Sequence, residues 1–241
     1  MAHGIDSSIS STEAKPQPSP ATLLRLLQLT SPTLPVGAYT YSEGLETLVQ
    51  QQQLTTAEAL ESWLRLELGH GTIRLEAVAI AQTMTALAHA DHPTVQYWND
   101  WLSALRETEE MREQSWQMGR SLNRLLHTLA PPLAEILDGC GEHCNVAIAF
   151  AIAAHHWQID PQTAVLGYLQ SWVSNLITAG VRLIPLGQTT GQQILLNLSP
   201  ALEETAIAAQ SLTPDTLYAC NWGVAIASMN HETLYSRLFR S

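Results

Sequence analysis

Apolar residues recur three or four positions apart along most of the chain, which is the spacing of one face of an α-helix. A long stripe of this kind runs from Met111 to Leu129, at alternating spacings of four and three. Thr55 and Glu58 have the spacing of a capping box, which predicts a helix start. The stripe of that helix is Leu60, Trp63, Leu64 and Leu68. No segment combines period-two alternation with the β-branched enrichment of a strand.

Two segments are expected at the centre of the fold. Residues 146–157 are apolar nearly all round, as in a helix buried within a bundle. Asp160 and Pro161 are suited to cap and begin a second helix, which we expect to reach Pro185. Residues 161–181 lack charge and are long enough to span a bilayer, but their amide and hydroxyl side chains favour a buried helix.

These patterns predict an all-α protein, a single-domain bundle of about nine or ten helices, without a 20–50-residue repeat. Residues 1–20 are rich in proline and serine, which predicts a disordered leader. The helical domain is expected over residues 21–241, beginning with a short helix over 23–29. Residues 215–227 are predicted to be helical, and residues 228–241 are expected to form a last amphipathic piece.

One stretch, residues 31–46, interrupts the helical pattern and is called the elbow. Pro32 and Pro35 keep its backbone out of a helix, and Gly37 permits a sharp turn. A helix is predicted to follow directly. One face would then carry Tyr41, Leu45, Leu48 and Val49, and the other Tyr39, Ser42, Glu43 and Glu46.

Charge and lysine usage exclude two classes of function. The chain has 22 acidic and 11 basic residues and a formal net charge of −11, which opposes phosphate binding and disfavours nucleic acid as a partner. A basic protein partner would suit this charge. Lys15, the single lysine, follows alanine, so the chain has no Gly-Lys-Ser/Thr loop and is not a P-loop nucleotidase.

Cysteine usage favours a cytoplasmic protein. Three cysteines, an odd number, argue against a disulfide framework. Residues 1–20 also contain no apolar core of a signal peptide.

Cys140, His143 and Cys144 are candidate metal ligands, because thiolates and imidazoles suit zinc or nickel. A structural site needs a fourth ligand, and no second cluster has the right local spacing. The alternative is an ordinary loop with a buried cysteine. His231 and Glu232 begin like a metalloprotease motif, but position 235 is tyrosine, which excludes that reading.

No catalytic site is expected. Glu43 and Glu46 have the spacing of an acid–base pair, but glutamates near a helix start more commonly favour the helix dipole. The serines Ser31, Ser42 and Ser171 lack the G-x-S-x-G context of a hydrolase nucleophile.

The C-terminal tail has the composition of an interface. Arg237 and Arg240 flank Leu238 and Phe239, and arginine and aromatic residues are favoured anchors between proteins. A frayed terminal helix is the alternative.

Four ordered motifs resemble the family of the urease accessory protein UreF. Residues 26–46 resemble its N-terminal signature, residues 113–119 its central motif, residues 171–188 its longest motif and residues 231–240 its C-terminal signature. Asn230 and Leu234 depart from the arginine and glutamine often seen there. Family members commonly have a histidine where His143 stands, without flanking cysteines, so the cysteine pair looks local to this protein.

This resemblance implies an all-α homodimer and a non-enzymatic maturation factor for urease, a nickel enzyme. Such a factor binds the accessory protein UreD, called UreH in some species, and recruits the GTPase UreG. The assembly supports GTP-dependent nickel delivery to apo-urease, whose active-site lysine must also be carbamylated. The factor itself would hold no cofactor stably, because nickel and GTP would be handled by the assembled complex.

Two groups of partner-binding residues are expected. The elbow and tail would contact UreD, through Pro35, Gly37, Tyr39, Tyr41, Tyr235, Arg237, Leu238, Phe239 and Arg240. Arg182 and Gln188 would form the dimer or the UreG surface.

Several alternatives stay open at this point. Pro35 and Gly37 would also suit a purely structural turn. A small helical metal-binding protein or metalloenzyme built on Cys140, His143 and Cys144 is the rival function. A GTPase-activating protein with an arginine finger is the third, which arginine content alone does not establish.

Overall fold

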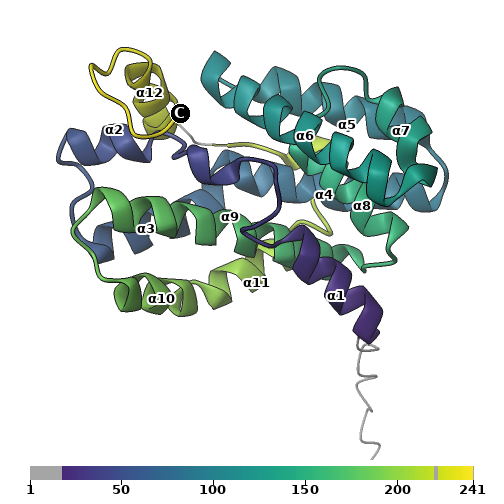
Figure 1. Cartoon of the computed structure of the whole chain (residues 1–241), viewed down its shortest axis with the longest axis horizontal. Coiled ribbons are helices and arrows are strands. Elements are labelled where there is room, and N and C mark those ends of the chain that lie inside the picture. Colours follow the sequence, from purple (N-terminus) through teal and green to yellow (C-terminus); the bar gives the residue numbers. More distant parts are fainter. Residues whose placement is uncertain (1–17, 220–221, 241) are drawn as a thin grey trace, which may run out of the picture.

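The computed structural model describes residues 18–219 and 222–240 (Figure 1). Within these ranges it contains twelve α-helices, three 3₁₀ helices and no strand, which confirms the all-α class. In chain order the elements are α1 (Pro20–Leu29), η1 (Ala38–Thr40), α2 (Leu45–Gln50), α3 (Ala57–His70), α4 (Thr72–Ala88), α5 (His92–Leu105), α6 (Glu109–Leu129), η2 (Pro131–Leu133), α7 (Ala134–Gly139), α8 (Val146–His156), α9 (Pro161–Leu183), α10 (Gln188–Asn197), α11 (Ser199–Ala208), η3 (Pro214–Thr216) and α12 (Trp222–His231).

The helix count exceeds the predicted nine or ten. Two of the helices, α2 and α7, have only six residues each. Helix α7 carries too few apolar positions to produce a clear periodic pattern, whereas α2 corresponds to the helix predicted after the elbow. The prediction was therefore right about the class and wrong about the number.

Helix α8 occupies the centre of the core, as predicted. Its residues 146–154 are all buried, and it packs most extensively against α4 and α6. The alanines along α4 and α8 allow the two helices to approach closely, since a methyl group adds little bulk. The apolar side chains that surround these helices form one continuous cluster.

Helix α9 begins as predicted, because the Asp160 carboxylate accepts a hydrogen bond of 3.0 Å from the Thr163 N–H. It packs against α4, α10 and α11, so its uncharged length is covered by other helices. In the part of the chain that the structure describes, no helix has both the length and the apolarity needed to cross a membrane.

Two predicted helix starts are displaced. Helix α1 begins at Pro20 rather than Leu23, because Ser19 caps it by accepting from the Thr22 N–H. Residues 1–17 of the predicted leader lie outside the described residues. Helix α3 is capped by Thr56 instead of Thr55, with its hydroxyl 3.2 Å from the Ala59 amide nitrogen.

The helix predicted to follow the elbow turn is not continuous. After η1 the backbone passes through Glu43 (φ 53°) and Gly44 (φ 81°), both left-handed, and α2 starts only at Leu45. A Cβ on Gly44 would lie 3.1 Å from the Ala227 Cβ, so α12 packs closely on this turn. The predicted polar face is consequently wrong: Ser42 and Glu46 are buried.

The C-terminal region also differs from the pattern. The helix expected over 215–227 is replaced by η3 and, later, by α12, which lies beside α2 (Figure 1). Residues 228–231 belong to α12, and after His231 the described chain forms turns and bends, so the amphipathic piece expected over 228–241 is helical only at its start. Side-chain contacts from other helices hold the tail instead, as described next. Residues 220–221 and 241 lie outside the described residues.

Candidate functional site

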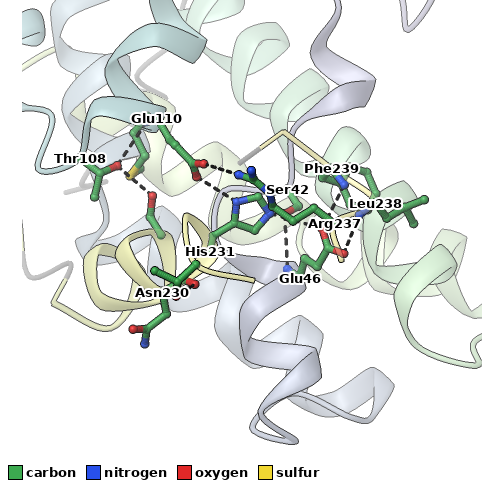
Figure 2. A network of polar contacts seen from close by, with 12 residues as sticks. Ser42, Glu46, Thr108, Glu110, Asn230, His231, Arg237, Leu238 and Phe239 are labelled. Atoms are coloured by element: carbon green, nitrogen blue, oxygen red, sulfur yellow. Dashed lines mark hydrogen bonds and ion pairs between the residues drawn. The ribbon is translucent and has the colours of Figure 1, made fainter. Parts of the chain in front are cut away.

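A buried carboxylate on α2 holds the C-terminal tail. The Glu46 side chain accepts hydrogen bonds from two successive backbone N–H groups, Leu238 at 2.8 Å and Phe239 at 3.0 Å (Figure 2). Glu46 is only 3% exposed, so these charge-assisted bonds are shielded from water. The tail backbone is therefore fixed at Leu238 and Phe239.

His231 extends this contact to a second helix. Its fully buried ring lies with Nε2 3.4 Å from Glu46 and Nδ1 2.9 Å from Glu110 of α6. The other oxygen of Glu110 accepts from Arg237 at 3.0 Å (Figure 2). We call Glu46, Glu110, His231 and Arg237 the tail latch, because they join α2, α6 and α12 to the tail.

The latch leaves some tail side chains free and buries one. Phe239 is 6% exposed and anchors the tail in the core, whereas Leu238 is 64% exposed and Tyr235 fully so. The Arg240 N–H donates to the Thr40 carbonyl at 2.8 Å. The tail therefore lies directly against η1 of the elbow.

Two hollows flank this junction, and both include Tyr41, Gln117 and Arg240. Their volumes are about 470 Å³ and about 500 Å³. The first is otherwise lined by Glu109, Glu110, Glu113, Gln114, Glu232 and Arg237. The second is otherwise lined by residues 32–37, Tyr39, Thr40 and Ser121. We call the two hollows together the elbow–tail groove.

The groove offers two different chemistries side by side. Four carboxylates and two guanidinium groups line the first hollow, and the aliphatic, proline and hydroxyl side chains of the elbow line much of the second. The Tyr41 hydroxyl, between them, donates to Gln117 at 2.9 Å. The groove therefore combines a charged part with a largely apolar part.

Glu43 and Glu46 do not act as a pair. The Glu43 carboxylate accepts from Gln114 at 2.8 Å and from the Trp172 indole at 2.9 Å, whereas Glu46 holds the tail. Burial, reinforced by nearby Glu76, raises the pKa of Glu43. Both glutamates therefore have structural partners.

The structure separates the predicted partner-binding residues into two places. Pro35, Gly37, Tyr39 and Tyr41 meet the tail in the elbow–tail groove. Gly37 also has a structural role, because its φ of 81° is left-handed. The exposed Arg182 and Gln188 lie at the end of α9 and the start of α10, and they line neither hollow.

The proposed metal ligands do not converge. The His143 ring stacks on Trp116 at a centroid distance of 4.0 Å. Cys140 and Cys144 are both buried, and each thiol donates to a backbone carbonyl, Cys140 to Ile136 at 3.5 Å and Cys144 to Asn145 at 3.7 Å. Across residues 18–219 and 222–240, no three His, Cys, Asp or Glu side chains are grouped so as to hold a metal ion.

Sequence reasoning missed the residues that organise this site. Glu110 and Gln117 lie on a helix whose pattern showed only a polar face, and no local signal indicates that they meet residues more than 70 positions away. His231 entered the sequence analysis as the start of a protease-like motif and of the C-terminal signature, and neither indicates a buried ring. The one signal for the burial of His231 is its position on the inner face of α12, three residues after the buried Ser228.

Known proteins show which family the chain belongs to. A protein of Trichormus variabilis is 53% identical over 218 residues, 90% of this chain and 95% of its own length. A protein of Microcystis aeruginosa is 54% identical over 219 residues, and one of Hahella chejuensis is 38% identical over 222. These cover 91% and 92% of this chain, and 97% and 99% of their own lengths. Each is named urease accessory protein UreF, and the UreF family model matches residues 54–199. The chain therefore belongs to the UreF family of urease accessory proteins.

Proposed function

We propose that this protein is a non-enzymatic scaffold in urease maturation, which binds UreD (UreH) through the elbow–tail groove. The observation that carries this proposal is the latch: Glu46 fixes the tail backbone so that exposed Leu238 stands beside the elbow. A preformed surface loses less conformational entropy on binding than a free tail would. Family membership supports the role in urease maturation.

The remaining partners follow from this role. The UreD-bound protein recruits the GTPase UreG, and the assembly delivers nickel to apo-urease in a GTP-dependent step. Nickel is cargo and GTP belongs to UreG, so this chain holds no cofactor stably. Arg182 and Gln188, exposed and away from the groove, are available for a homodimer or for UreG. The complex would assemble in the cytoplasm, without nucleic acid or membrane.

The matching test replaces an exposed residue of the tail. Leu238→Asp removes an apolar contact and adds a charge, but it leaves the Leu238 backbone N–H on Glu46 intact. We expect binding to immobilised UreD to weaken at least 10-fold, because a buried unpaired carboxylate is strongly disfavoured in an interface. Biolayer interferometry with purified UreD measures the dissociation constant.

A matched control is available on α10, where Leu196 is 67% exposed, as against 64% for Leu238. Leu196→Asp adds the same charge to a leucine of similar exposure outside the groove. If both variants, or neither, lose UreD binding, the Leu238 side chain, which lies on the tail beside the groove, is not part of the UreD site. Tyr39→Ala, with exposed Tyr97→Ala as its control, tests the elbow in the same way.

Measurements with UreG distinguish a scaffold from a protein that activates GTP hydrolysis by UreG. A scaffold retains UreG in a pull-down with UreD and leaves its rate of GTP hydrolysis unchanged. A rise in that rate, lost in Arg237→Ala or Arg240→Ala, would support the arginine-finger alternative instead.

A further inference from the structure

His231 lies between the two carboxylates of the tail latch, and its protonation state decides the charge of the whole cluster. Glu46 and Glu110 supply two negative charges, and Arg237 supplies one positive charge. The His231 ring is fully buried and Glu46 nearly so, which means that water screens the imbalance only weakly. A protonated ring makes the positive and negative charges of the latch equal.

Both ring nitrogens of His231 face carboxylate oxygens (Figure 2). Nδ1 is 2.9 Å from a Glu110 oxygen, and Nε2 is 3.4 Å from a Glu46 oxygen. A neutral imidazole has one N–H, so in either tautomer the lone pair of the other nitrogen points at a carboxylate. The protonated ring instead donates on both sides.

The Glu46 oxygen that faces His231 also holds the tail. This oxygen, Oε2, accepts the Phe239 N–H at 3.0 Å, and Oε1 accepts the Leu238 N–H at 2.8 Å. Both carboxylates of the latch serve as acceptors, since Glu110 accepts from the Arg237 guanidinium. The shared proton therefore belongs on the ring, and its loss turns a lone pair toward the atom that fixes the tail.

The charged groups around the ring favour its positive form. Among residues 45–50 and 222–231, which form α2 and α12, Glu46 and His231 are the only ionisable side chains. Helix α6 presents Glu110 and the tail presents Arg237, while Thr108, which contacts α12 ahead of α6, is uncharged. Three more carboxylates and one guanidinium line the first hollow beside Glu110, which adds to the negative surroundings. They belong to Glu109, Glu113, Glu232 and Arg240.

We propose that the tail latch is a proton-operated switch, which is closed while His231 is protonated and opens when the ring releases its proton to solvent. Histidine changes its charge between about pH 5 and about pH 8, so the switch works near neutral pH. The closed latch binds the proton more tightly than the open one. It is therefore firmest at the acidic end of this range and loosens as the pH rises.

The consequence for partners rests on the proposed function. An open latch frees Leu238 and Phe239 from Glu46, and the elbow–tail groove then loses the fixed tail backbone on one side. UreD accordingly binds more weakly as the pH rises through this range. The proton thus regulates the same surface that the proposed function uses.

The test follows one amide of the full-length protein. Phenylalanine occurs only twice in the chain, at positions 150 and 239, so ¹⁵N-phenylalanine labelling gives one amide signal from α8 and one from the latch. We expect the protection factor of the Phe239 amide against hydrogen exchange to fall about 10-fold or more between about pH 6 and about pH 8, because a charge-assisted hydrogen bond is lost. The Phe150 signal reports that the core is folded.

Three variants separate a switch from a passive contact. His231→Gln has no proton to release in this range, so the protection of Phe239 should no longer depend on pH. Glu110→Gln should keep the latch closed to higher pH, because its amide donates to Nδ1 and a neutral ring then donates to Glu46. His156→Gln, at an exposed histidine on α8, should behave like the parent. The proposal is overturned if Phe239 is equally protected at both pH values in the parent, if the fall persists in His231→Gln, or if Glu110→Gln follows the parent.

UreD binding at the same two pH values distinguishes this inference from the proposed function. The ratio of the two dissociation constants is compared between the parent and His231→Gln, which cancels the titration of UreD itself. We expect this ratio to be about 10-fold larger in the parent, since one proton is linked to closure. If Phe239 responds to pH as described but the ratio is the same in both proteins, the switch stands and the groove is not the UreD site.

Discussion

At the residue scale, the tail depends on one buried carboxylate. Glu46 accepts two backbone N–H groups and lies beside His231, so each of its oxygens has a partner. A neutral imidazole has a single N–H donor, so a neutral His231 donates to only one of Glu46 and Glu110, and the protonated ring donates to both. The stability of the latch therefore depends on the charges of its side chains and on the number of hydrogen-bond donors and acceptors that face each other.

Glu46→Gln tests this count. A glutamine keeps one acceptor and turns the other oxygen into an NH₂ group, which faces a backbone N–H of the tail. We expect a loss of about 1–3 kcal/mol in the free energy of unfolding, because a buried donor is left unsatisfied. Urea unfolding followed by circular dichroism measures this. The exposed Glu204→Gln on α11 is the control and should stay within about 0.5 kcal/mol of the parent. Equal effects of both changes would contradict the role given to Glu46.

The pKa of Glu67 on α3 predicts how the free energy of unfolding depends on pH. Burial, with nearby Glu43 and Glu107, raises its pKa from 4.5 to about 8. The folded state therefore holds a proton that the unfolded state releases above pH 4.5. The contribution of this bound proton to the free energy of unfolding is fully present below pH 4.5. It is lost as the pH rises toward about 8.

Glu67→Gln should flatten this dependence, because glutamine has no proton to release. We expect the parent to lose stability between about pH 5 and about pH 8 and the variant to lose less, as measured by urea midpoints across that range. Glu58→Gln is a suitable control on the same helix, since burial of Glu58 is negligible and its pKa is lowered instead. An unchanged pH profile in Glu67→Gln would show that Glu67 is ionised in the folded protein.

At the scale of elements, the sequence pattern predicted a helix correctly where its burial and boundaries depend on residues that are close together in the sequence. The centre of α8 and the Asp160 cap of α9 were predicted, because both depend on residues within a few positions. The break before α2 was not predictable in this way. Glu43 takes a left-handed φ that glutamate rarely adopts, and its carboxylate is held by Gln114 and Trp172, which lie 71 and 129 positions away.

The contact between α6 and the loop before α8 rests on Gly119. Because a Cβ would lie 1.9 Å from the Cys144 carbonyl oxygen, Gly119→Ala forces the helix and loop apart. We expect a loss of about 1–3 kcal/mol from overpacking, despite the better helix propensity of alanine. Thermal unfolding provides the measurement.

The control for this change is another helical glycine. Gly69→Ala on α3 meets nothing within 4 Å and should stabilise the protein by about 0.5–1 kcal/mol. A destabilisation of similar size in both variants would mean that backbone freedom, and not the close approach, decides the outcome.

At the scale of the whole molecule, the class was predictable and the candidate site only in part. Tyr39, Tyr41, Arg237 and Arg240 were predicted to bind a partner, and this stays a prediction; their meeting in one groove was not readable from the pattern. That meeting depends on Glu46 and Leu238, which are 192 positions apart. Periodicity reports only which face of a helix is buried, not which distant segment covers it.

Removal of residues 235–241 tests whether the helical core folds without the tail. Of the apolar cluster around α8 this deletion removes only Phe239, so we expect the far-ultraviolet circular dichroism spectrum to be retained. Loss of the buried Phe239 ring should lower stability by about 3–5 kcal/mol. UreD binding should be abolished. A truncated protein that is folded and still binds UreD would exclude the tail from the interface.

The tail latch also has a consequence for synthesis on the ribosome. The latch needs Arg237, Leu238 and Phe239 to reach Glu46 and Glu110, so it forms only after these residues have left the ribosome. Nascent chains and products that stop before residue 237 therefore lack the assembled groove, even when their helices have folded. The elbow, although it is made early, gains its neighbouring tail only after all the described helices have been synthesised.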